Sequence, residues 1–201
     1  MRISDDRYDR DRFRLDIAMQ FIRHEARTHT IRQWTGLTDD RIRKLYHAYL
    51  RGGSGGSGAG IARHRGKSPH QAAFFLRTAK LRQEAAALAG ICCLLGLLDR
   101  RRGQNGGGAP AAYRPDLRDA AGVSRAASLC QAYAFYRAMV GTPAISFEHA
   151  VLLVNALSRG YELRFADCRG CGALIVVDSL ALELAHCVLC ESSGDTTDHE
   201  C

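Results

Sequence analysis

Four cysteines towards the end of the sequence constrain this chain more than any other feature. They form two C-x-x-C pairs, Cys168 with Cys171 and Cys187 with Cys190, and fifteen residues separate the pairs. Two such pairs supply the four tetrahedral thiolates of a structural Zn²⁺ ion and leave no ligand position open for water or substrate. The spacing therefore predicts one structural zinc ion per chain. The alternative, dithiol pairs or disulfides, has no secretory context to support it.

Short β segments are predicted around these cysteines. Alternating apolar residues indicate a strand that leads into Cys168, and the β-branched stretch 173–177 indicates the second strand of a hairpin. With each cysteine pair in a tight turn, residues 161–191 are expected to form a small zinc-ribbon-like β module. Residues 192–201 are expected to be a disordered tail. His186 is an alternative ligand, although four thiolates already close the coordination shell.

The composition is ordinary for a globular protein and excludes several classes. Of the 201 residues, 46% are apolar, and the longest apolar run, 85–98, is too short to span a bilayer. The first residues hold no apolar signal core. We therefore expect a cytoplasmic protein without a membrane partner. No catalytic motif such as G-x-S-x-G or a P-loop is present, so we do not expect an enzyme.

Charge is distributed unevenly along the chain. The formal net charge is +7, and all of this excess falls within residues 1–67, because the remainder carries equal numbers of basic and acidic side chains. A basic portion joined to a neutral remainder favours a polyanion-binding face, with DNA or RNA as the partner. A basic surface without any partner is the alternative.

Residues 1–51 are predicted to form a basic helical region with a helix-turn-helix-like segment. A first amphipathic helix is followed by a short helix through Trp34, a turn at Gly36 and a third helix capped by Thr38. A plain helical hairpin has the same pattern, and Arg32 stands where close helix approach favours a small residue. Basic residues on the exposed side of the third helix are candidate DNA contacts, namely Arg41, Arg43, Lys44 and His47.

Residues 52–67 are predicted to be a flexible linker and a basic loop. The stretch 52–60 contains only Gly, Ser and Ala, which is typical of a flexible linker. The basic residues that follow it, Arg63, Arg65 and Lys67, form a candidate phosphate-binding loop, for which a solvated basic loop is the alternative.

Residues 68–160 are predicted to form a helical core that is interrupted by an irregular insertion near 99–122. A helix is expected to begin with Ser68 as N-cap and Pro69 as its first residue. A later helix is expected from the cap at Ser146. The remaining cysteines of this core, Cys92, Cys93 and Cys130, are interpreted as apolar packing residues. The predicted fold class is therefore mainly α, with a small C-terminal β module that binds zinc through four cysteines.

Several blocks of residues, in this order along the chain, resemble the FlhC family of flagellar transcriptional activator subunits. The resemblance covers most of the chain, although the stretches 52–60 and 101–122 look like insertions. The blocks are Asp16-Ile-Ala-Met-Gln20, Thr35-Gly-Leu-Thr38 with Arg41-Ile-Arg-Lys-Leu-Tyr46, Arg65-Gly-Lys-Ser-Pro69, and the closing pair of C-x-x-C motifs.

This resemblance implies a function and partners. It implies assembly with FlhD into a hetero-oligomer, a heterohexamer, that binds promoter DNA, activates flagellar operons and works with RNA polymerase. It also implies that the four cysteines are zinc ligands, whereas the DNA-contacting residues named above rest on charge and position alone. A zinc-stabilised adaptor that binds an acidic protein, and a dithiol redox enzyme, are the alternatives from other classes.

Overall fold

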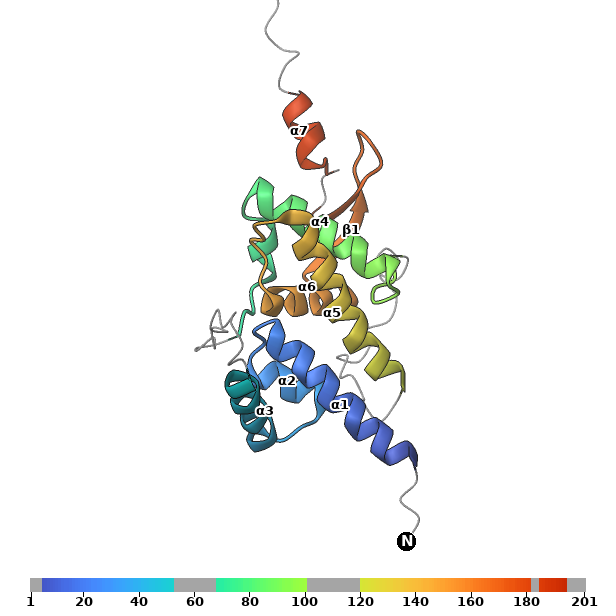
Figure 1. Ribbon diagram of the computed structural model, residues 1–201. Helices are drawn as coiled ribbons and strands as arrows, with labels where there is room; N and C mark the ends of the chain where they lie inside the picture. The colour runs from blue at the N-terminus through green and yellow to red at the C-terminus, as the bar shows by residue number, and fades with distance from the viewer. Residues whose placement is uncertain (1–4, 53–67, 101–119, 182–184, 195–201) are drawn as a thin grey trace, which may run out of the picture. The chain divides into compact units, whose positions relative to one another are not determined.

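A computed structural model of the chain describes residues 5–52, 68–100, 120–181 and 185–194. Within these ranges the chain is mainly helical and carries one two-stranded sheet, which confirms the mainly α prediction with a small β element (Figure 1). None of the helices in these ranges is long and apolar enough to cross a membrane. The chain divides into unit 1, residues 1–68 and 114–131, and unit 2, residues 69–113 and 132–201.

Three helices of unit 1 pack around a common core. They are α1 (Asp5–Arg23), α2 (Thr28–Thr35) and α3 (Asp39–Gly52). Phe21 and Trp34 are buried, and their ring centroids lie 5.9 Å apart. The buried hydroxyl of Tyr46 donates a hydrogen bond to the carbonyl oxygen of Ala26, which fastens α3 to the segment after α1. Other buried residues of this core are Ile17, Ala18, Ile22, Ile31 and Ile42.

Left-handed residues end the first two helices. Glu25 has a φ of 60°, and the next residue, Ala26, donates its N–H to the Phe21 carbonyl at 2.9 Å. Gly36 has a φ of 67° and donates its N–H to the Arg32 carbonyl at 2.8 Å. Glycine adopts this conformation without the Cβ clash of other residues. The turn predicted at Gly36 is therefore confirmed.

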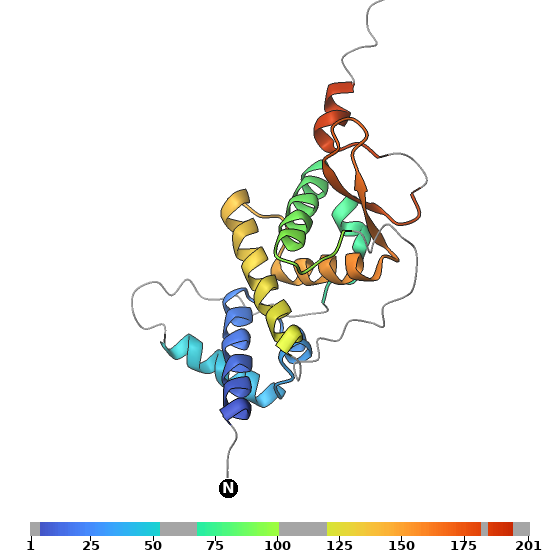
Figure 2. The ribbon, with the colours of Figure 1, turned by 90° about the vertical axis from the view of Figure 1, so that its right-hand side faces the viewer.

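Helix α4 (Ala79–Leu94) is central to unit 2. It follows the short 3₁₀ helix η1 (Ala72–Leu76) and contacts η1, α6 (Phe147–Arg159) and the second strand of the sheet. Figure 2 shows α4 in green and α6 in orange beside the hairpin. The fully buried residues of α4 are Ala85, Leu88, Ala89 and Cys92.

A buried carboxylate joins α4 to helix α5 (Ala120–Val140) and to the loop before α6. Glu84 is 5% exposed and accepts hydrogen bonds from the Tyr136 hydroxyl and from the N–H of Ala144 at 2.9 Å. The Tyr136 oxygen in turn accepts a bond from the N–H of Ile145 at 3.2 Å. Burial raises the pKa of Tyr136 above its ordinary value, so the hydroxyl keeps its proton and remains a donor.

Strands β1 (Leu163–Asp167) and β2 (Leu174–Asp178) form an antiparallel hairpin whose two faces have different partners. Phe165 pairs with Val176 and both are buried, while Leu174 on the same face approaches Gly90 of α4. On the opposite face, Ile175 and Val177 form a small cluster with three of the four cysteines, Cys168, Cys187 and Cys190. Because side chains alternate between faces, one face of the hairpin carries buried core residues and the other face carries the cysteine cluster.

The start of the central helix differs from the prediction. Ser68 and Pro69 do not begin an α-helix; instead η1 forms first, and α4 begins after Thr78. The Thr78 hydroxyl oxygen accepts the N–H of Leu81 at 3.2 Å and so provides the helix cap. A helix start needs such an acceptor for its unpaired N–H groups, and here Thr78 supplies it.

The other boundaries lie close to the predicted ones. Helix α6 is capped by Ser146 and ends at Gly160, as predicted. Helix α5 begins at Ala120, inside the stretch 99–122 predicted to be irregular, of which residues 101–119 lie outside the described residues. The chain is also helical through 194, three residues into the predicted disordered tail, and residues 195–201 lie outside the described residues. Cys92 and Cys130 are buried as predicted, whereas Cys93 is half-buried.

Candidate metal centre

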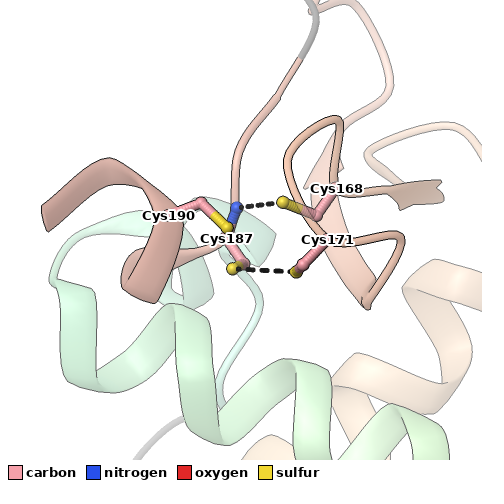
Figure 3. Close-up of side chains that lie close together, drawn as sticks. All are labelled: Cys168, Cys171, Cys187 and Cys190. Carbon is pink, nitrogen blue, oxygen red and sulfur yellow. Dashed lines mark hydrogen bonds between the residues drawn. The ribbon is translucent and has the colours of Figure 1, made fainter. Parts of the chain in front are cut away.

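The first cysteine pair lies at the tip of the β hairpin. Cys168 follows β1 directly, and its N–H donates to the Ala173 carbonyl at 2.9 Å. Gly172 turns the chain back with a φ of 71°, and its N–H donates to the Cys168 carbonyl at 2.8 Å. This tight turn is the local structure predicted for a C-x-x-C pair, and it points two sulfur atoms to the same side (Figure 3).

The second pair lies at the start of a helix, not in a second ribbon turn. Helix α7 (Val188–Gly194) begins directly after Cys187, and the N–H of Glu191 donates to the Cys187 carbonyl at 3.0 Å. One helical turn separates Cys187 from Cys190, so both sulfur atoms reach the hairpin tip. The zinc-ribbon-like β module predicted for 161–191 therefore has its two strands but ends in a helix, because a C-x-x-C spacing suits a helical turn as well as a hairpin turn.

The four sulfur atoms are close enough to share one ion. They all lie within 4.8 Å of one another, and the Sγ atoms of Cys171 and Cys187 are 3.6 Å apart. A tetrahedral zinc–thiolate site with bonds of about 2.3 Å places its sulfur atoms about 3.8 Å apart. The residues therefore fit a tetrahedral metal ion, and this group could hold one.

Backbone donors favour the thiolate at one of the four positions. The N–H of Cys187 donates to Cys168 Sγ at 3.1 Å, and this bond is the main cause that lowers the pKa of Cys168 to about 6. Metal ligands must be thiolates, so a low pKa at Cys168 suits that role. Burial raises the pKa of Cys92 and of Cys130 to about 12. Hydrogen bonding with the Cys187 thiol raises the pKa of Cys190 to about 12 as well, so geometry and not pKa identifies the four ligands.

Gly170 is a residue of this site that the sequence did not single out. A Cβ atom on Gly170 would lie 2.9 Å from Cys190 Sγ and 3.2 Å from Cys190 Cβ. The same Cβ would lie 3.6 Å from His186 Nδ1, so His186 is a neighbour of the site but is not among the four grouped ligands. Only glycine, which has no Cβ atom, leaves room at this position for the Cys190 side chain. The Cys-Arg-Gly-Cys sequence contains this signal, but only the packing of the second pair reveals its meaning.

Two ion pairs hold the centre to the rest of unit 2. Arg82 of α4 binds Glu191 of α7 through two hydrogen bonds of 2.9 and 2.6 Å. Arg100 pairs with Asp167, the residue that precedes Cys168. Both pairs are partly exposed, so they add little to the free energy of unfolding. Their main effect is to set the positions of the segments that they join. They fix the two ligand-bearing segments on the helical framework.

The candidate DNA contacts belong to unit 1, and the metal ligands belong to unit 2. The predicted contacts on α3, Arg41, Arg43, Lys44 and His47, are all exposed. Arg43 is paired with Asp40 at 3.0 Å, while no ion pair joins Arg41 or Lys44 to another described residue. The other predicted contacts, Arg63, Arg65 and Lys67, lie outside the described residues.

No family model matches the chain, and no curated protein matches it.

Proposed function

We propose that the chain is a DNA-binding subunit of a transcriptional activator of the FlhC type, which acts with FlhD at flagellar promoters and recruits RNA polymerase. The observation that carries this proposal is the exposed basic side of α3 in unit 1, where Arg41, Lys44 and His47 face solvent. A helix that buries one side and presents cations on the other can enter the major groove and bind phosphates.

The packing around Gly36 supports a helix-turn-helix interpretation of α2 and α3. Ile42 and Tyr46 turn the inner side of α3 toward the core, so the opposite side is available to DNA. Arg32, which stood against this interpretation in the sequence, is exposed and lies 3.6 Å from Asp39. A bulky residue at that position therefore points away from the helix interface.

The acidic residues at the start of α3 are compatible with DNA binding. Asp39 pairs with Arg32, and Asp40 pairs with Arg43, so each carboxylate is balanced by a neighbouring cation. Both residues also lie in the first turn of α3, where negative charge stabilises the helix.

Zinc is the ion that we propose for the cysteine centre, in a structural role. Four thiolate ligands select a soft or borderline ion and leave no coordination position for a substrate. The centre joins the hairpin tip to α7, which suits a structural ion. The zinc thus maintains unit 2, while unit 1 supplies DNA contacts.

DNA binding can be tested by charge reversal on α3. Zinc-loaded protein assembled with FlhD should retard a labelled flagellar promoter fragment, and R41E/K44E should lower the affinity at least tenfold. If two phosphate contacts are lost, the slope of log K against log[salt] should fall by about 1.8.

The matched control changes the same amount of charge elsewhere. Arg137 and Arg159 are exposed basic residues of unit 2, so R137E/R159E should bind the promoter nearly as well as the unsubstituted chain. Equal loss in both double variants, or no retarded complex from zinc-loaded assembled protein at low salt, would overturn the proposal.

An adaptor that binds protein and not DNA is the second candidate. It is favoured by an apolar groove of about 420 Å³ in unit 2, lined by residues of α4, β2 and α7 such as Ala86, Ile175 and Leu189. A concave apolar surface of this kind can receive an apolar side chain of a partner protein. The same promoter assay separates the candidates, because an adaptor would assemble with FlhD and yet give no retarded promoter complex.

A further inference from the structure

We propose that Cys171 and Cys187 form a disulfide when the centre meets a two-electron oxidant such as hydrogen peroxide, and that this bond replaces the metal ion. The proposal rests on the metal centre proposed above. It assigns a reversible oxidation site to two particular thiols among the seven cysteines of the described residues.

The distance between the two sulfur atoms permits a bond. The Sγ atoms of Cys171 and Cys187 lie 3.6 Å apart, in direct contact. A disulfide bond is about 2.05 Å long, so the two sulfur atoms must approach by about 1.5 Å to form one. The two residues also belong to different segments, the hairpin tip and the start of α7.

Exposure selects the thiol that reacts first. Cys171 is exposed and Cys187 is half-buried, whereas Cys168 is only 2% exposed. Cys190 is half-buried, and the backbone of Gly170 lies against its sulfur, where even an added methyl carbon would come within 2.9 Å. An oxidant from solvent therefore reaches Cys171 most readily.

The chemistry balances with peroxide as the oxidant. The Cys171 thiolate attacks one peroxide oxygen, the O–O bond breaks, and a sulfenic acid forms with release of hydroxide. The Cys187 thiolate then attacks that sulfur, an S–S bond forms, and a second hydroxide leaves. Two protons convert the hydroxides to water, so two thiolates are oxidised and one peroxide is reduced to two waters.

The oxidised centre keeps the link between the hairpin tip and α7 while it loses the metal ion. Cys168 and Cys190 remain as thiols, and two ligands hold an ion far more weakly than four do. The new bond joins the same two segments that the metal joined, and Arg82 still pairs with Glu191. The oxidised form is therefore held in place for reduction and reloading.

The test is graded peroxide treatment of the zinc-loaded full chain. Zinc release is followed with a chromogenic chelator, and the free thiols are alkylated before digestion. Trypsin and a glutamate-specific protease together separate Cys168, on 165–169, from Cys171, on 170–183, and from Cys187 and Cys190, on 184–191. Fragmentation in the mass spectrometer then distinguishes Cys187 from Cys190.

We expect one zinc ion released for each Cys171–Cys187 disulfide, and full zinc rebinding after treatment with a dithiol and Zn²⁺. The variant C93S/C201S, which removes two thiols outside the centre, should release zinc at the same rate. Release that is accompanied by Cys168–Cys171 or Cys187–Cys190 links instead would overturn the proposal, as would oxidation without zinc release.

Failure of the metal centre itself is recognised separately. The zinc content before oxidation reports on the proposed centre, and promoter binding reports on the proposed function. The disulfide map and the zinc released on oxidation report on this inference.

Discussion

Two glycines flank Cys171, and each is required for a different physical reason. Gly170 is required for space, because a Cβ atom there would press on Cys190 Sγ. Gly172 is required for its backbone conformation, since its φ is 71° and no atom would meet an added Cβ within 4 Å. The pair therefore offers a comparison of steric exclusion with backbone strain at one metal site.

Substitution of Gly170 by alanine should weaken metal binding more than the same change at Gly172. G170A must displace a ligand sulfur, and changes beside metal ligands typically cost 10- to 100-fold in affinity, so we expect a loss of about 100-fold. G172A places alanine in the left-handed region at about 1 kcal/mol, which corresponds to about fivefold. Competition with a zinc-binding dye measures both. A smaller loss in G170A than in G172A would show that Cys190 has room to move.

Between elements, the Glu84 carboxylate is a buried polar link of unit 2. It receives the Tyr136 hydroxyl from α5 and the N–H of Ala144 from the loop before α6. Lys80 Nζ lies 3.7 Å from the second oxygen of the same carboxylate. A buried carboxylate is stable only with such partners, so this link depends on all of them.

Removal of the Tyr136 hydroxyl should destabilise unit 2. Y136F takes one donor from Glu84 and the acceptor from Ile145 N–H, and an unsatisfied buried polar group costs about 1–3 kcal/mol. Urea unfolding followed by circular dichroism should show this as a lower midpoint. Y161F is the matched control, because Tyr161 is 62% exposed. Equal midpoints for the two variants would mean that water replaces the hydroxyl.

Elements with local signals were predictable from the sequence. Helix α6 was predicted with its boundaries, because Ser146 caps its first turn through His149 N–H and Gly160 ends it in the left-handed conformation. The start of α4 was missed because Ser68-Pro69 carries the same local signal as a true cap, and only the packed chain shows that Thr78 is used. Local sequence patterns identify candidate helix caps, and tertiary packing determines which of these caps is used.

The ligands of the candidate site could be predicted from the sequence, whereas the contacts that position those ligands could not. The cysteine spacing identified Cys168, Cys171, Cys187 and Cys190 as ligands, because a C-x-x-C spacing by itself brings two thiolates close together. The helical setting of the second pair was missed, since the same spacing fits a turn or a helix. The Arg82–Glu191 pair spans 109 residues, so no local pattern could reveal it. Arg63, Arg65 and Lys67 stay predictions.

At the scale of the whole molecule, the proposed DNA contacts and the proposed metal ligands lie in different units. The exposed cations of α3 lie in unit 1, and the four cysteines lie in unit 2. Unit 1 has its own buried aromatic core around Phe21 and Trp34. Each unit thus has buried contacts of its own.

Removal of the metal should therefore loosen one end of unit 2 and leave α1–α3 unchanged. After chelation, hydrogen–deuterium exchange is expected to rise in peptides from 163–178 and 185–194, because the ion no longer joins the hairpin tip to α7. Peptides from 28–52 should keep their protection. The variant C168S, which loses a ligand without a chelator present, should give the same pattern. Equal loss of protection in α2 and α3 would contradict independent units.

The long separation between Arg82 and Glu191 has a consequence for synthesis of the chain. At about 5–20 residues per second, a ribosome needs roughly 5 to 20 s to add the residues between them. During the first part of that interval α4 lacks helix α6, and during most of it α4 lacks strand β2, because both contact α4 and come later in the chain. The first three helices need no such delay, since Ala26 and Tyr46 meet across only 20 residues. We therefore expect nascent chains to expose the apolar residues of 79–94 until α6 and β2 have been synthesised.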